Sequence, residues 1–229
     1  MRVIICGDTH GNFPELLRFA EEPLPDLVIV AGDFGYWPGT RWGRDLQIFD
    51  PPFPVHFCDG NHEDHVALQI RRDNGPPRAH RIGEPNVFWQ DRGSTLTLPD
   101  GRVVLFAGGA WSQDWDLRTD GVDWHKDLEI LTEEDFARFP NVHVDIVVSH
   151  TMPGRFLPGF LGSMLLQFEG SDSSRDVLDK VFEKYRPSMW FFGHWHDRQS
   201  GLMDGCAWHG LAAFDDAQGQ EDGFFVLEG

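Results

Sequence analysis

Six short apolar runs, separated in several places by segments with a helical pattern, constrain the fold of this chain more than any other feature. They are residues 2–6, 27–31, 54–58, 102–107, 144–150 and 189–194. Nearly continuous apolar sequence of this length is typical of strands that are covered on both faces. Helical patterns occur at residues 12–20, 62–72, 132–138 and 173–185. The alternation of strand and helix predicts an α/β protein.

Local signals support two of these helices and indicate a change of pattern near the end of the chain. Asn12 is a candidate cap with Pro14 in the first turn, and Thr132 followed by Asp135 resembles a capping box. Short strand-like pieces follow at residues 198–203, 206–209 and 223–227. We expect these pieces to add antiparallel strands at the end of a sheet.

The length and the cysteines limit the class of protein. The 229 residues contain no Pro/Gly/Ser-rich linker and no repeat, so we expect one domain over residues 1–229. Cys6, Cys58 and Cys206 are odd in number and sparse, which indicates reduced thiols in a cytoplasmic protein. The first apolar run is too short for a signal peptide, and no stretch approaches the length of a membrane span.

The net charge of −18 argues against binding to duplex nucleic acid, because the phosphates would be repelled. Such a charge also suits a protein that attracts metal cations, although a solvated acidic surface is the commoner explanation. The sequence makes no prediction of the oligomeric state.

Polar residues with metal-binding side chains follow five of the apolar runs directly. "GDTH" gives Asp8 and His10, "GD" gives Asp33, "GNHE" gives Asn61 and His62, "SH" gives His150, and "GHWH" gives His194 and His196. Ligands bind at the carboxyl edge of strands in open α/β sheets, because the loops converge there. We therefore expect these side chains to meet at one edge.

The last pair carries a further expectation. In an extended segment, His194 and His196 point the same way and Trp195 points the other way, as suits two metal ligands. A single His-x-His more often has one packed and one solvated histidine, but the ordered set favours a metal site. Nitrogen and oxygen donors without thiolates suit two moderately hard divalent ions such as manganese, iron or zinc.

These ordered blocks, from residue 7 to residue 196, resemble the calcineurin-like metallophosphoesterase superfamily. The resemblance implies an αββα sandwich, in which two mixed β-sheets pack face to face with helices outside. It also implies two divalent metal ions, with Mn²⁺ as the leading candidate and Fe, Zn, Ni or Co as alternatives. The implied ligands are Asp8, His10 and His196 for the first metal, Asn61, His150 and His194 for the second, and Asp33 as the bridge.

The same resemblance makes His62 the acid that protonates the leaving group, with Asn61 and Asp33 as its catalytic neighbours. Two cations about 4 Å apart can hold a bridging hydroxide, neutralise phosphoryl oxygens and favour in-line attack. A histidine suits the role of acid because its unperturbed pKa is about 6.5.

The second block departs from that of the Ser/Thr protein phosphatases of the superfamily, which read Gly-Asp-x-Val-Asp-Arg-Gly. In those enzymes the second Asp orients the acid histidine and the Arg binds phosphate. Here "GDFGYWPG" has Tyr36 and Trp37 at those two positions. The departure disfavours a protein phosphatase and leaves His62 without an assigned orienting partner.

Residues 108–135 resemble a loop block of small bacterial and phage members of the superfamily. Arg118 in this block is our first candidate for a phosphate contact and Arg155 is the second, while pairing of Arg118 with a nearby acid is equally open. Aromatic rings near the site would stack a nucleobase, bury an aryl leaving group, or only pack. The rings on or near the expected site edge are Phe34, Tyr36, Trp37, Trp111, Trp115 and Trp195, with Tyr36, Trp37 and Trp111 as the candidates for substrate binding.

These observations favour a dinuclear metal-dependent phosphoesterase acting on phosphodiesters of small molecules, with cyclic or short nucleotides as the leading substrates. A broad-range phosphomonoesterase is the close alternative. A nuclease would need a basic groove, and the chain has only "RRD" at residues 71–73 and scattered arginines. A catalytically inactive metal-binding scaffold would be expected to have lost ligands, and all of them are present.

Overall fold

The structure, a computed structural model, describes residues 1–20, 23–38, 40, 46, 49–75, 79–81, 86–156, 172–214 and 222–229. Its strands form two six-stranded sheets, ordered β12-β1-β2-β3-β5-β4 and β10-β11-β9-β8-β7-β6. The first contains β1 (Arg2–Cys6), β2 (Leu27–Val30), β3 (Val55–Phe57), β4 (Ala79–Arg81), β5 (Val87–Gln90) and β12 (Phe224–Glu228). The second contains β6 (Thr95–Thr97), β7 (Val103–Ala107), β8 (Ile146–Ser149), β9 (Met189–Phe192), β10 (Gln199–Met203) and β11 (Cys206–Gly210).

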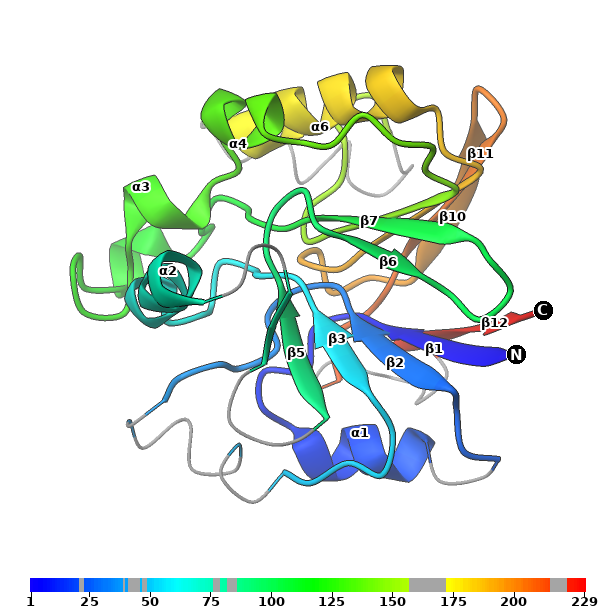
Figure 1. Cartoon of the computed structure of the whole chain (residues 1–229). Coiled ribbons are helices and arrows are strands. Elements are labelled where there is room, and N and C mark those ends of the chain that lie inside the picture. Colours follow the sequence, from blue (N-terminus) through cyan, green and yellow to red (C-terminus); the bar gives the residue numbers. More distant parts are fainter. Residues whose placement is uncertain are drawn as a thin grey trace.

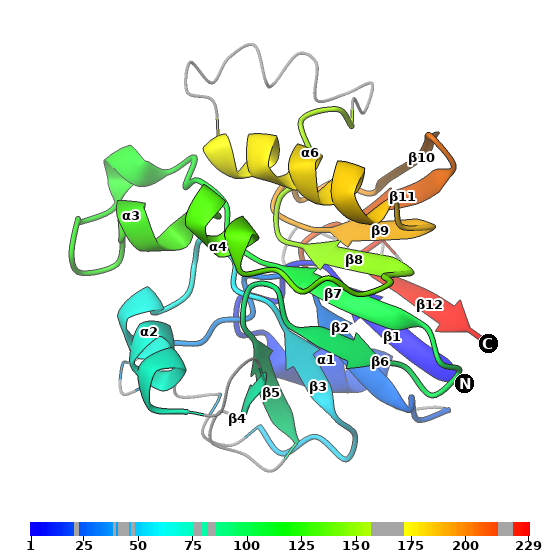
Figure 2. The same cartoon turned by 45° about the horizontal axis from the view of Figure 1, so that its top comes forward.

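Helices cover the outer faces of both sheets, which confirms the expected αββα sandwich (Figure 1). The described helices are α1 (Phe13–Phe19), α2 (His65–Asn74), α3 (Lys126–Glu129), α4 (Glu133–Ala137), α6 (Ser173–Tyr185) and the 3₁₀ helix η2 (Trp115–Leu117). α1 lies on the first sheet, whereas α4 and α6 lie on the second (Figures 1 and 2). α2 and α3 lie beside each other at one end of the sandwich.

The apolar runs are continuous because both faces of each sheet are buried. In β1, Ile4 joins the cluster packed around α1, while Ile5 joins the cluster between the two sheets. In β8, Val147 joins the cluster beneath α6 and Val148 joins the one between the sheets. Alternate residues of a strand thus enter different cores, and few positions remain for polar side chains.

The helix signals are largely confirmed. Thr132 and Asp135 form a reciprocal capping box on α4, and α6 has the predicted bounds. Pro14 lies in the first turn of α1, although the Asn12 side chain makes no capping hydrogen bond. α2 begins later than expected, because its cap is Asp64, whose side chain accepts a 2.9 Å bond from Ala67 N.

The prediction for the end of the chain is partly wrong. β10 and β11 are antiparallel, but β11 pairs parallel with β9, and β12 crosses to the first sheet to pair antiparallel with β1. The two termini consequently lie side by side (Figure 1). Strand-like patterns show where chain is extended, but they do not specify its partner.

Candidate metal centre

The polar residues singled out in the sequence meet at the carboxyl ends of parallel strands. Asp8, Asp33 and Asn61 follow β1, β2 and β3, which run parallel in the first sheet. His150 and the pair His194 and His196 follow β8 and β9, which run parallel in the second sheet. Both sheets therefore contribute to one site, as expected.

Four of the predicted metal ligands have a left-handed backbone conformation, which sets the direction of their side chains. Their φ angles are positive: His10 46°, Asp33 46°, His194 67° and His196 53°. Such angles are uncommon for residues with a Cβ and concentrate at functional sites. The loops also support one another, because the amides of Thr9 and His10 both donate to Asp33 O, at 3.1 and 2.7 Å.

The expected geometry of His194 and His196 is therefore wrong. β9 ends at Phe192, so the two histidines do not alternate along an extended strand. His196 Nε2 lies 3.1 Å from Asp8 Oδ2, whereas the His194 ring packs 4.9 Å from the His150 ring. Both imidazoles reach the site, but they enter different parts of it.

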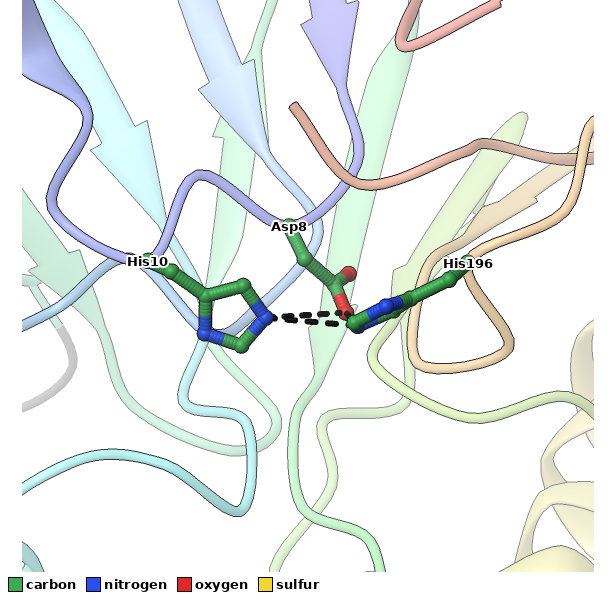
Figure 3. A group of neighbouring side chains, drawn as sticks. All are labelled: Asp8, His10 and His196. Atoms are coloured by element: carbon green, nitrogen blue, oxygen red, sulfur yellow. Dashed lines mark hydrogen bonds and ion pairs between the residues drawn. The ribbon is translucent and has the colours of Figure 1, made fainter. Parts of the chain in front are cut away.

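Asp8, His10 and His196 form the first cluster (Figure 3). One ligand atom from each lies within 4.8 Å of the others. The His10 and His196 Nε2 atoms are 3.3 Å apart, and Asp8 Oδ2 is 3.9 Å from His10 Nε2. Asp8 is buried, so its carboxylate lies at the base of this cluster.

Asp8, Asp33 and His150 form a second, fully buried cluster that shares Asp8 with the first. His150 Nδ1 donates a 2.8 Å hydrogen bond to Ala31 O, which leaves Nε2 to face the site. That nitrogen lies 3.4 Å from Asp33 Oδ1 and 2.9 Å from Asn61 Oδ1. Asp33 Oδ2 also lies 3.9 Å from His10 Nε2, so this carboxylate of the second cluster reaches a histidine of the first.

The electrostatics of the cluster favour positive charge. Burial raises the pKa of Asp8 and Asp33, but nearby imidazoles, His150 first, outweigh it and hold both pKa values below the usual range. Burial opposes charge on His150, yet the two carboxylates raise its pKa to about 10. Burial lowers the pKa of His194 to about 3, because a charge on this buried ring is costly.

Glycines in the motif blocks make room for the carboxylates. A Cβ on Gly193 would overlap Asp8 Oδ1, and a Cβ on Gly60 would overlap Asp33 Oδ1. The glycines of "GHWH" and "GNHE" are therefore required by the close approach of a buried carboxylate to the backbone.

His62 lies beside the two clusters. Its amide donates to Asp33 Oδ1 at 2.8 Å, and Trp37 Nε1 donates to its carbonyl at 2.8 Å. Its Nε2 lies 3.7 Å from Asp114 Oδ2, a partner that the sequence analysis did not identify. Burial lowers the pKa of His62, with Asp33 acting in the opposite direction.

Glu63, the last residue of "GNHE", connects two of the loops. Its carboxylate accepts from Gly35 N at 3.0 Å and Gly60 N at 2.5 Å. Burial, followed by the charge of Asp33, raises the pKa of Glu63 to about 8.

Two adjoining hollows share His62 and Asp114 in their walls. The first is also lined by Asp33, Asn61, Gln113, His194, Trp195 and His196. The second is also lined by His10, Gly35, Trp37, Arg118 and Asp123. Gln113 and Asp114 were not among the predicted site residues, although both fall within the loop block at residues 108–135.

Arg118 makes the pairing with acids that the sequence left open, and its contact with a phosphate stays a prediction. It lines the second hollow and donates to Asn61 O at 3.3 Å, and its Nη1 also lies 3.8 Å from carboxylate oxygens of both Asp114 and Glu129. Arg155 is different, because it pairs with Asp179 and Glu183 of α6. Its expected phosphate contact is therefore corrected.

The candidate aromatic residues also differ in where the structure places them. Trp37 lines the second hollow. Tyr36 is buried in the core with 2% of its surface exposed, and its hydroxyl accepts a 2.6 Å bond from Arg71, so its expected stacking role is corrected. Trp111 is half-buried and does not line either hollow.

Comparisons with known proteins agree with this geometry. The sequence model described as calcineurin-like phosphoesterase matches residues 1–198. The lariat debranching enzyme of Schizosaccharomyces pombe is 23% identical over 235 residues, covering 89% of this chain and 50% of that protein. Serine/threonine-protein phosphatase 5 of Homo sapiens is 29% identical over 128 residues, covering 49% of this chain and 25% of that protein.

The fold is shared with the solved phosphopantetheinyl hydrolase of Mycobacterium tuberculosis, with a TM-score of 0.55 and 12% identity over 98% of this chain and 95% of that chain. The chain spans about half the length of the curated relatives that match most of its sequence. Among the described helices, none has the length and apolar character needed to cross a membrane.

Proposed function

Because this chain belongs to the calcineurin-like phosphoesterase family, we propose that it is a metal-dependent phosphoric ester hydrolase that holds two divalent cations. The observation that carries the proposal is the pair of clusters that share Asp8. In this proposal Asp8, His10 and His196 hold the first cation. Asn61, His150 and His194 hold the second, and Asp33 bridges them.

The donor set fits such cations. Four imidazoles, two carboxylates and one amide oxygen converge without a thiolate, which suits Mn²⁺ first and Fe, Zn, Ni or Co as alternatives. When bound, the cations would lower the pKa of a water molecule and neutralise phosphoryl oxygens.

The residues around the clusters would then bind the substrate and move a proton. His62 would give a proton to the leaving oxygen, because it lines both hollows without joining either cluster. Arg118 would contact the phosphate from the second hollow, with its position set by Asn61 O and the Ser112 hydroxyl.

Phosphodiesters of small molecules, and cyclic or short nucleotides in particular, are the proposed substrates. Trp37 and Trp195 in the walls of the hollows support this class, because their rings can stack a base. A broad-range phosphomonoesterase remains the second candidate. The net charge of −18 argues against a nuclease. The three free cysteines support the cytoplasm as the location.

The test is hydrolysis by the manganese-loaded protein of an aryl phosphomonoester, an aryl phosphodiester, and 2′,3′- and 3′,5′-cyclic nucleotides. Diester turnover that disappears in Asp33→Ala and falls strongly in His62→Ala would support the proposal. The matched control is His143→Ala, because the His143 side chain is 79% exposed and contacts Asp145. Turnover of the monoester alone would favour the second candidate, and metal binding without any turnover would favour the scaffold.

A further inference from the structure

The carboxylate that faces His62 comes from a different part of the chain than in the protein phosphatases that the sequence resembles. Residues 36 and 37 are Tyr and Trp, and they supply neither a carboxylate nor a guanidinium. Asp114, in the loop after β7, lies with its Oδ2 3.7 Å from His62 Nε2. Its Oδ1 lies 3.8 Å from Arg118 Nη1. One carboxylate thus stands between the histidine and the arginine.

This carboxylate is not committed to another role. Asp114 Oδ1 is buried and has no hydrogen-bond partner within the described part of the chain. Both His62 and Asp114 line the two hollows, so the pair lies where a phosphate ester would bind. A buried carboxylate oxygen without a hydrogen bond is costly, which favours a functional reason for its position.

The loop that carries Asp114 is firmly anchored. Ser112 N and Oγ both donate to the buried Glu129 carboxylate at 2.8 Å. Ala110 N donates to Glu129 O at 3.0 Å, and Leu117 N donates to Asp114 O at 2.9 Å. These hydrogen bonds therefore hold Asp114 in place beside His62, which lies in the loop that follows β3.

We propose that Asp114 is the positioning residue for His62, and that its carboxylate also aligns Arg118. The segment at residues 112–118 would then replace, from another loop, the Asp and Arg that the second motif block lacks. The proposal rests on the phosphoesterase function proposed above, and its second test below does not depend on turnover.

The arrangement assigns the two ring nitrogens of His62. Nε2 faces Asp114, which leaves Nδ1 for the leaving group. As the P–O bond breaks, the bonding pair goes to the leaving oxygen and the Nδ1 proton of the imidazolium is transferred to it. The neutral imidazole then keeps its hydrogen on Nε2, where Asp114 accepts it.

The first test compares phosphodiesters whose leaving groups range from 4-nitrophenol to a simple alcohol. A poor leaving group needs the acid most, so Asp114→Ala should lower kcat by about tenfold for the nitrophenyl ester and by about a hundredfold or more for the alkyl ester. KM should change little, and Asp114→Glu should restore part of kcat. Asp116→Ala is the matched control, because Asp116 is exposed in the same segment. An equal loss for all leaving groups would overturn the proposal.

The second test reads the ring of His62 directly, by ¹⁵N NMR of histidine-labelled, zinc-loaded protein, with the signal assigned by its loss in His62→Ala. The native ring should carry its hydrogen on Nε2, and Asp114→Ala should give a mixture of tautomers with unchanged metal content. An unchanged tautomer would overturn the positioning role. A changed tautomer in a protein that hydrolyses no ester would instead refute the proposed function alone.

Discussion

His10 and His196 face each other with their Nε2 atoms 3.3 Å apart (Figure 3). His10 follows β1 of the first sheet and His196 follows β9 of the second, so this contact joins the two sheets. With Asp8 Oδ2 3.1 Å from His196 Nε2, the three side chains direct one potential ligand atom each toward the same point. A divalent cation at this point would link the sheets.

Removing one of these imidazoles should remove one cation. We expect His196→Ala to lose about one metal equivalent and part of the thermal stabilisation by metal, since a ligand at 100 times its Kd stabilises a fold by about 2.7 kcal/mol. Metal analysis and melting with and without Mn²⁺ measure both effects. His143→Ala should behave as the native protein, and unchanged metal content in His196→Ala would refute the assignment.

Adding one methyl group should disrupt the site without changing a ligand. In Gly193→Ala the new Cβ would overlap Asp8 Oδ1, so we expect at least about tenfold weaker metal binding, measured by calorimetry. Gly101→Ala is the control, because no heavy atom lies within 4 Å of its Cβ position, although its φ of 92° adds backbone strain. Equal metal affinity in the two variants would show that the carboxylate tolerates the methyl group.

Arg92 should be essential for stability because its buried guanidinium pairs with a buried carboxylate and donates to backbone carbonyls. Its guanidinium pairs with Asp59 at 2.7 Å and donates to the carbonyls of Leu128, Glu129 and Ile130. Arg92→Met would leave Asp59 buried and unpaired, so the free energy of unfolding should fall by about 3 to 5 kcal/mol.

Urea unfolding measures this loss. The matched control is Arg102→Met, whose pair with Asp100 lies at the more exposed surface and should cost about 1 kcal/mol or less. Similar losses in the two variants would contradict the role of Arg92. The double variant Arg92→Met with Asp59→Asn should recover part of the stability, because it removes the unpaired charge.

His56 should make the fold sensitive to mild acid. Burial lowers its pKa to about 4, whereas an unfolded histidine has a pKa of about 6.5. Because the folded pKa is depressed, the stability that the neutral His56 contributes is fully present above pH 6.5 and is lost as the pH falls toward 4. The expected loss between pH 7 and pH 5 is about 2 kcal/mol. Urea unfolding of His56→Gln should show a pH-dependent loss smaller by this amount, and parallel losses in both proteins would exclude His56 as the cause.

The sequence predicts the site well for residues that come directly after a strand. Asp8, Asp33 and Asn61 follow parallel strands of one sheet, so knowing the strand ends was enough to bring these three together. His150 follows β8 of the second sheet, and it reaches them because the two sheets pack face to face. The alternation of strands and helices predicted only an α/β protein, and the αββα sandwich was expected from the family that these ordered blocks resemble. The backbone at His194 and His196 was missed, since a left-handed φ is uncommon for any residue with a Cβ and a histidine does not by itself specify it.

What the sequence missed depends on contacts between distant segments. β12 pairs with β1 across almost the whole chain, and no local pattern specifies that pairing. Arg155 forms an ion pair with Asp179 of α6. Tyr36 is buried, whereas its neighbour Trp37 lines a hollow. Asp114 faces His62 because the loop after β7 is anchored to Glu129, which is a property of packing.

The bridged pair of cations is tested most directly by titrating metal-free protein with Mn²⁺ and measuring turnover of an aryl phosphodiester. We expect activity to rise only as about two equivalents bind, and Asp33→Ala to stay inactive at every metal concentration because the bridge is lost. Full activity with one equivalent, or turnover that is independent of Asp33, would contradict a pair of cations bridged by this carboxylate.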